Sequence, residues 1–234
     1  MSAAQLDTLR NENDWDTITV GGETLNVEKS VITLNVNTFF DENDGSATIG
    51  AGRSLRDAII IANNDPTNDY IINLGSGQTY FLTLGLADEN NGLEGDLDIQ
   101  NGANITIRTN GASPATINAS TLLGDGDRVF DVLSGGALTL EKVIVTGGRT
   151  RGFVSGAGIS NSGALNIFQS TITNNTTGNN ANGGGIYNIG NATIVQSTIN
   201  DNFASSGGGG ISNEGDLTIT HSTISGNCGI SFRF

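Results

Sequence analysis

Three segments of the chain repeat one another and decide the fold: GAGISNSGALNIFQSTITNN at residues 156–175, GGGIYNIGNATIVQSTINDN at 183–202 and GGGISNEGDLTITHSTISGN at 208–227. They align without internal gaps and start 27 and then 25 residues apart. The difference in spacing lies in the linkers at 176–182 and 203–207, whose Gly, Ser, Asn and Thr are typical of loops. Such a period is typical of a solenoid of stacked coils.

Within each repeat, aliphatic and polar residues alternate as in a strand with one buried face. Leu165 and Ile167 flank Asn166, and the Ser-Thr-Ile at 170–172 begins a second short strand. The repeats leave no room for a crossover helix and lack the Leu-x-x-Leu-x-Leu pattern of leucine-rich repeats. The sequence therefore predicts an all-β chain folded as a right-handed parallel β-helix, with the handedness taken from the general rule for parallel connections.

Weaker copies of the repeat extend toward the N-terminus. SGGALTLEKVIVTGG at 134–148 keeps the turn glycines and the alternating aliphatics, and a fainter copy starts at residue 101. We therefore expect about five coils. They are predicted to occupy residues 95–227, followed by a non-repeat tail at 228–234.

Two polar columns are expected to stack from coil to coil. Asparagines end equivalent strands, and serines occupy a second equivalent position, at Asn175, Asn202, Asn227, Ser170, Ser197 and Ser222. Identical side chains on adjacent strands lie about 4.8 Å apart, where amide ladders form. These six residues are predicted to be structural ladders.

The segment before the repeats has a different pattern. Ser54 is a candidate N-cap with Asp57 three residues later, and the apolar residues of 54–63 fall on one helical face. Because a solenoid needs a cover on its apolar end, we predict that residues 31–94 form an N-terminal capping region around this helix. Residues 1–30 show no clear element.

The composition excludes several classes of protein. Ten Lys and Arg against 24 Asp and Glu give a net charge of −14, and the sequence has no basic patch for nucleic acid. The single cysteine, Cys228, allows no intrachain disulfide. The longest aliphatic run, at 58–62, is far shorter than the about 20 residues that span a membrane. No secretion signal peptide is visible.

Residues 32–99 resemble the CSLREA-type N-terminal region of bacterial surface β-helix proteins. The matching pieces are ITLNVNTFFDENDGSA at 32–47, RSLRDAIIIAN at 53–63 and GDLDI at 95–99. Arg53 stands where that family usually has cysteine, and Asp57 where it commonly has glutamate.

The repeats resemble those of polymorphic outer-membrane proteins, whose motifs are Gly-Gly-aliphatic-aliphatic and Phe-x-x-Asn. The counterparts are GGIY at 184–187, GGI at 209–211 and the Ile-x-x-Asn sequences that end at the three ladder asparagines. Together the two resemblances imply a secreted or cell-surface β-helix, commonly adhesive, with no shared set of catalytic residues.

Calcium is the one cofactor that the sequence leaves open. Asp96 and Asp98 are expected on the outward face of the GDLDI strand if Leu97 and Ile99 point inward, and oxygen ligands suit a hard cation. The plain alternative is a solvated strand face. Arg108 and Arg128 are the nearest bases in sequence.

Other catalytic patterns are absent from the repeats. Asp201 and Asp216 have no acidic residue at the equivalent position of a neighbouring coil, which argues against the paired carboxylates of a hydrolase. His221, the sole histidine, shares a column with Gln169 and Gln196 and is expected to be an exposed corner residue. No catalytic residue is predicted.

Three functions remain after this step. The first is a non-catalytic, adhesin-like or surface-structural protein that binds carbohydrate or another surface ligand. The second is a polysaccharide lyase or glycoside hydrolase of the pectate-lyase-like β-helix type, and the third is a structural spacer. Because no cap is visible after Asn227, end-to-end self-association through the last coil is a further hypothesis.

Overall fold

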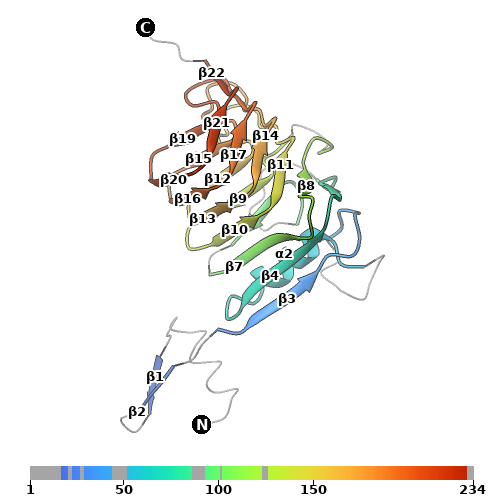
Figure 1. The fold of residues 1–234 in the computed structure, drawn as a ribbon, viewed down its shortest axis with the longest axis vertical. Coiled ribbons are helices and arrows are strands. Elements are labelled where there is room, and N and C mark those ends of the chain that lie inside the picture. The colour runs from blue at the N-terminus through green and yellow to red at the C-terminus, as the bar shows by residue number, and fades with distance from the viewer. Residues whose placement is uncertain are drawn as a thin grey trace.

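The described residues form a parallel β-helix with one short helix, as the computed structural model shows (Figure 1). The structure describes residues 17–20, 23–26, 29–43, 52–85, 93–100, 102–122 and 126–230. Three parallel sheets run along the stack, and each complete coil contributes one strand to each sheet in turn. The predicted all-β solenoid with an N-terminal helix is thereby confirmed.

Sheet 1 has seven strands: β3 (Val31–Asn35), β4 (Asp69–Gly75), β7 (Asn104–Asn110), β10 (Ala137–Glu141), β13 (Ala164–Phe168), β16 (Asn191–Val195) and β20 (Asp216–Thr220). Sheet 2 has six: β5 (Thr79–Phe81), β8 (Ala115–Asn118), β11 (Val143–Thr146), β14 (Thr171–Thr173), β17 (Thr198–Asn200) and β21 (Thr223–Ser225). Sheet 3 has five: β6 (Leu97–Ile99), β9 (Phe130–Val132), β12 (Ile159–Asn161), β15 (Ile186–Asn188) and β19 (Ile211–Asn213).

Two smaller pairs complete the strands of the described residues. β18 (Phe203–Ala204) pairs in parallel with β22 (Cys228–Gly229), so the loops between sheets 2 and 3 also stack. β1 (Thr17–Val20) and β2 (Glu23–Asn26) form an antiparallel hairpin within the range to which the sequence assigned no element.

The register of the strands follows the columns read from the sequence. Ile167 pairs with Ile194, which pairs with Ile219, and Leu138 pairs with Leu165. In the inner coils these aliphatics are buried, so each coil supplies a few side chains to one narrow core.

The stack begins earlier in the chain than residue 95. β4 and β5 lie within the range 31–94, yet they pair with β7 and β8 in the same register as the later coils. That range therefore supplies strands as well as a cap. The strands β4 and β5 were missed because the turns of the first coil do not repeat the glycine pattern of the later ones, whereas the alternation of apolar and polar residues at 32–36 indicates the strand β3.

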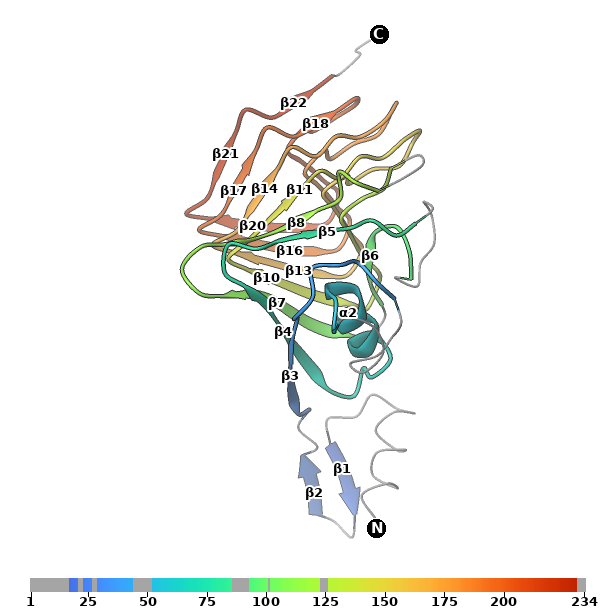
Figure 2. The same ribbon diagram turned by 90° about the vertical axis from the view of Figure 1, so that its right-hand side faces the viewer.

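Helix α2 (Leu55–Asn63) lies at the N-terminal end of the stack (Figure 2). The Ser54 side chain accepts a hydrogen bond from the Asp57 backbone N–H, and the Asp57 carboxylate accepts one from the Ser54 backbone N–H. This is the capping box that the sequence predicted. The apolar face of α2 packs against β4, β6 and β7, which is the cover expected for a solenoid end.

A buried ion pair fixes this cap to the first coil. The Arg56 guanidinium donates to Asp41 Oδ1 at 2.8 Å and to Asp41 Oδ2 at 3.2 Å, and both side chains are almost fully buried. Arg56 also donates to the carbonyl oxygens of Gly95 and Asp96. Asp41 Oδ2 accepts from the backbone N–H groups of Thr83 and Leu84. Every partner is charged or hydrogen-bonded, which a buried pair requires.

The predicted asparagine ladder lies inside the wall of the solenoid. Asn175 Nδ2 donates to Asn202 Oδ1 at 3.0 Å, and Asn202 Nδ2 donates to Asn227 Oδ1 at 3.0 Å. A second ladder that we did not predict joins Asn161, Asn188 and Asn213, although the shared Ile-x-Asn of the repeats was visible. Among the described residues, no helix has the length and apolarity to cross a membrane.

Candidate functional site

A buried cluster of acidic side chains lies where sheet 3 starts. Asp98 on β6 pairs with Asp131 on β9, and carboxylate oxygens of Asp96, Asp98 and Asp131 lie within 4.8 Å of one another. Leu97 and Ile99 face the core, as predicted. The solvated strand face, however, is wrong, because Asp96 is 1% and Asp98 0% exposed.

Arg128 provides the positive charge of this cluster. Its Nε donates to Asp96 Oδ2 at 2.9 Å, and its Nη2 lies 3.4 Å from Asp131 Oδ2. Asp127 is also buried, and its carboxylate accepts from the backbone N–H groups of Asp96 and Arg128. The cluster is therefore a charged network inside the wall.

Burial and crowding shift the protonation of Asp96. Loss of solvent and the neighbouring Asp127 carboxylate raise the pKa of Asp96 to about 7, against the opposing effect of Arg128. Burial by itself lowers the pKa of Arg128, but the attraction of Asp96 and Asp131 outweighs it and raises that pKa. Arg128 is consequently charged at all ordinary pH values, whereas Asp96 titrates near neutrality.

Three carboxylates this close offer the ligands that a hard cation prefers. Arg128 already neutralises part of their charge, so calcium at Asp96 and Asp98 stays a prediction. The sequence reading missed Asp131 and Asp127. The signal was available, because LDI at 97–99 and FDV at 130–132 share one pattern of apolar, acidic and apolar residues.

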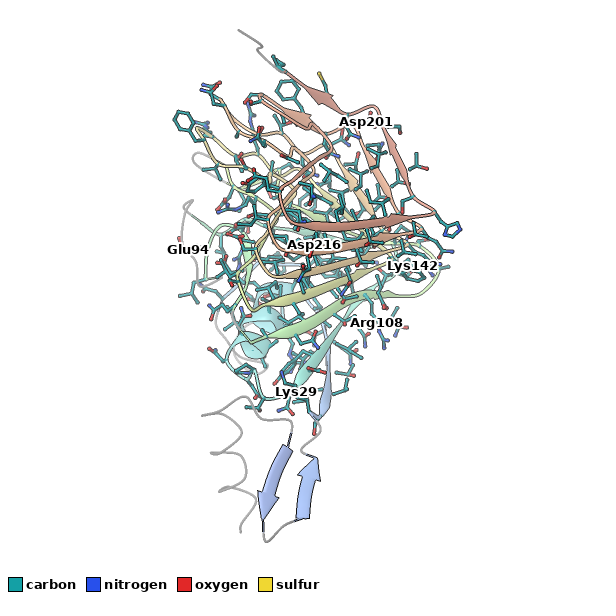
Figure 3. The ribbon with its side chains drawn as sticks, turned by 90° about the vertical axis from the view of Figure 1, so that its left-hand side faces the viewer. Lys29, Glu94, Arg108, Lys142, Asp201 and Asp216 are labelled. Atoms are coloured by element: carbon teal, nitrogen blue, oxygen red, sulfur yellow. The ribbon has the colours of Figure 1, made fainter. Side chains whose placement is uncertain are left out.

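The other candidate residues named from the sequence lie apart from one another in the described part of the chain. His221 is exposed with φ of 50°, at the same corner as Gln169 and Gln196, as predicted. Figure 3 shows Asp201 and Asp216 on separate parts of the last coils. Arg108, one of the two nearest bases, lies on sheet 1 and donates to Asn73 Oδ1 at 2.9 Å.

The outward face of sheet 2 carries two columns of uncharged side chains. One column follows the first outward position of each strand: Thr79, Thr116, Ile144, Thr171, Thr198 and Thr223. The second follows the next outward position: Phe81, Asn118, Thr146, Thr173, Asn200 and Ser225. Hydroxyl and amide groups thus repeat at the spacing of the strands, about 4.8 Å.

An aromatic hollow borders this face at its first coil. It has a volume of about 450 Å³ and is lined by Phe39, Phe40, Asp41, Phe81, Thr83 and Thr121. Phe39 is 53%, Phe40 73% and Phe81 42% exposed. Exposed phenylalanines gathered in one place mark an interaction surface rather than a core.

Two further hollows lie at the carboxyl ends of the sheet 2 strands. The first, about 420 Å³, is lined by Ala119, Ser120, Leu122, Gly126, Gly147, Gly148, Arg149, Arg151, Asn174 and Thr176. The second, about 340 Å³, shares Arg149, Arg151 and Thr176 with it and continues to Asn179. Thr121 lines the aromatic hollow, and its chain neighbours Ser120 and Leu122 line the first of these two hollows. We call these three hollows the loop track.

The predicted ladders do not contribute to this surface. Asn175, Asn202, Ser170 and Ser197 are 0–3% exposed, so their polar groups bind one another and the backbone rather than a ligand. The columns of sheet 2 face outward and are half-buried in most coils, and the sequence did not separate them from the ladders.

Comparison of the chain with models of protein families, with curated proteins and with solved structures finds no match in any of the three. The resemblance to CSLREA-type and polymorphic outer-membrane proteins stays a prediction.

Proposed function

We propose that the protein is a non-catalytic, adhesin-like β-helix, secreted or displayed on a cell surface, that binds carbohydrate along sheet 2 and the loop track. One observation carries this proposal: the aromatic hollow adjoins two columns of uncharged hydroxyl and amide side chains. Secretion or surface display rests on the family resemblance alone.

The chemistry of the surface matches that of a glycan. The faces of sugar rings are apolar and pack on aromatic side chains, which supply most of the contact area in such sites. Phe40 and Phe81 offer exposed rings for this purpose. Threonine and asparagine side chains donate to and accept from sugar hydroxyls. A regular array of strands presents these groups at one repeat, which suits a polymer.

The alternative is a polysaccharide lyase or glycoside hydrolase, and one observation favours it. The pKa of Asp96 is raised to about 7 beside a charged arginine, as in many acid–base sites. Asp127 of this cluster directly follows Gly126, which lines the loop track. Asp96 and Asp98 are buried, however, and the described residues show no exposed carboxylate pair on neighbouring coils. Binding without turnover is therefore the better-supported function.

The test is a glycan array run with Phe81→Ala and a matched control. Phe168 is 39% exposed on the outward face of sheet 1, so Phe168→Ala removes a similar ring from another face. We expect Phe81→Ala to lower affinity at least tenfold, about 1.4 kcal/mol, and Phe168→Ala to leave it unchanged. Equal effects of the two variants would contradict the proposed surface.

A turnover assay on the same glycans separates the two functions. Acidic and neutral polysaccharides are incubated with the protein, and new reducing ends and unsaturated products are measured. We expect neither product. Product formed by the wild type and lost in Asp96→Asn would replace the binding function with a lyase or hydrolase.

A further inference from the structure

The polar end of the loop track carries two arginines in a chain that has few. Arg149 and Arg151 each line the two hollows at the carboxyl ends of the sheet 2 strands. The whole chain has ten Lys and Arg against 24 Asp and Glu. Both residues are exposed. Within the described part of the chain, no hydrogen bond or ion pair is made by the Arg149 guanidinium. That group is therefore available to a ligand.

The loop that holds Arg149 is fixed on both sides. The Arg149 backbone N–H donates to Asp127 O at 2.8 Å, and the backbone N–H of Thr150 donates to Thr176 O at 3.1 Å. Arg149 pairs with Thr176 as an isolated bridge between coils. A fixed backbone lowers the entropy that binding costs, because only the side chain remains to be ordered.

A close approach holds the neighbouring loop against Arg151. A Cβ on Gly178 would lie 2.6 Å from the Arg151 Cα, so only glycine allows the two loops to stack at this distance. This packing shapes the second hollow around the arginine pair.

The neighbouring groups suit a charged saccharide. A guanidinium binds a carboxylate or sulfate through two parallel hydrogen bonds. Hydroxyl and amide groups of Ser120, Asn174 and Thr176 line the same hollow and fit the hydroxyls around such a group. A phosphate polymer would meet the same arginines, but the phenylalanines and hydroxyl columns favour sugar rings beside them.

We infer that the loop track binds an acidic polysaccharide, with Arg149 and Arg151 holding one of its anionic groups while the aromatic hollow holds a sugar ring. This inference rests on the proposed carbohydrate-binding function and names its ligand class. The acidic surface of the rest of the protein repels the same polymer, so binding is confined to this track.

Asp201 sets a limit on the site. It is exposed and occupies the position equivalent to Asn174, one coil further along, because Thr173 pairs with Asn200. Its carboxylate opposes an anionic ligand that extends toward the last coil. Asp201→Asn is therefore expected to strengthen binding about twofold.

Calorimetric titration of the full chain provides the test. The probes are an oligogalacturonate, its methyl ester, a sulfated glucan and a neutral glucan of similar length. The variants are Arg149→Gln, Arg151→Gln and the control Arg108→Gln, which removes a guanidinium that lies on sheet 1. Melting curves of each variant report whether the fold is retained.

We expect an acidic probe to bind at least tenfold more tightly than its uncharged counterpart. Arg149→Gln is expected to weaken this binding about 10- to 100-fold, or about 1.4–2.7 kcal/mol, since hydrogen bonds to charged groups are stronger than neutral ones. Arg108→Gln is expected to have no effect. Preference for galacturonate or for the sulfated glucan identifies the anionic group.

The outcomes separate this inference from the proposed function. Equal binding of charged and neutral glycans, still lost in Phe81→Ala, overturns the anionic ligand and keeps the carbohydrate surface. Acidic binding that Arg149→Gln and Arg151→Gln leave intact also overturns the inference. No binding of any glycan overturns both.

Discussion

Some polar columns of the protein are buried in the corners of the coils and others face outward from a sheet, and they have different roles. Asn202 points into the wall and is 1% exposed, whereas Asn166 points outward from sheet 1 and is exposed. Both are asparagines in the repeats, and each forms a hydrogen bond with a side chain of a neighbouring coil. The comparison teaches that burial, rather than the residue type, decides whether an asparagine stabilises the fold.

The hydrogen bonds show the size of the difference. Asn202 Oδ1 accepts from the backbone N–H and the Nδ2 of Asn175, and Asn202 Nδ2 donates to Ile172 O and Asn227 Oδ1. Asn166 makes one long contact of 3.4 Å with Thr139 Oγ1. Removal of a buried amide with four hydrogen bonds lowers the stability of the fold, because its partners lose their bonds. When an exposed amide is removed, water takes over its hydrogen bonds.

The largest expected effect comes from removing the central ladder amide. Asn202→Ala removes the acceptor of the buried Asn175 backbone N–H and of Asn175 Nδ2, and we expect the free energy of unfolding to fall by about 2–4 kcal/mol. Asn166→Ala is expected to change it by less than about 0.5 kcal/mol. Urea denaturation measures both, and similar losses in the two variants would break the comparison.

A second prediction uses pH to distinguish buried from exposed acids. Because the pKa of Asp96 is raised to about 7 from 3.8, the folded state binds an extra proton between these values. The contribution of the protonated Asp96 carboxyl to the stability of the fold is therefore present below about pH 4 and is lost as the pH rises through about 7.

The variant Asp96→Asn isolates this effect. The stability of the wild type relative to Asp96→Asn is expected to fall between pH 4 and 7, measured by urea denaturation at each pH. The exposed Asp216→Asn controls for the removal of one negative charge from the surface. A relative stability that rises over this range would contradict the account of the cluster.

The adjacent residues Ser197 and Thr198 offer the same comparison of a buried and an outward-facing side chain, with smaller expected losses of stability. Ser197 is 3% exposed, and its Oγ donates to Val195 O and accepts from the Ser170 backbone N–H. Ser197→Ala is expected to cost about 1–2 kcal/mol. Thr198→Ala, on the outward face of sheet 2, is expected to cost about 0.5 kcal/mol or less and to weaken glycan binding two- to fivefold. Thermal melting and glycan titration report the two effects separately.

Much of the fold could be predicted because repeats display their own register. Ile159, Ile186 and Ile211 align in the sequence and pair in sheet 3. Equivalent positions of the repeats therefore predicted the paired residues of neighbouring strands. The first coil was harder, because β4 and β5 precede the regular glycine turns and only their pairing identifies them.

The candidate site was largely hidden from the sequence. Asp98 and Asp131 lie on neighbouring coils, and their contact depends on a register that the faint early repeats did not reveal. Phe40 and Phe81 meet only because the segment before α2 folds over the first coil. Arg149 looked like part of an ordinary loop, because no local pattern shows that two loops stack to form a hollow.

The most direct measurement is a crystal structure of the protein with a bound acidic tetrasaccharide. Our account predicts sugar rings against Phe40 and Phe81, an anionic group at Arg149, and ladder asparagines that keep their bonds to one another. A saccharide bound on sheet 1, or one bound at the buried Asp96 cluster, would contradict it.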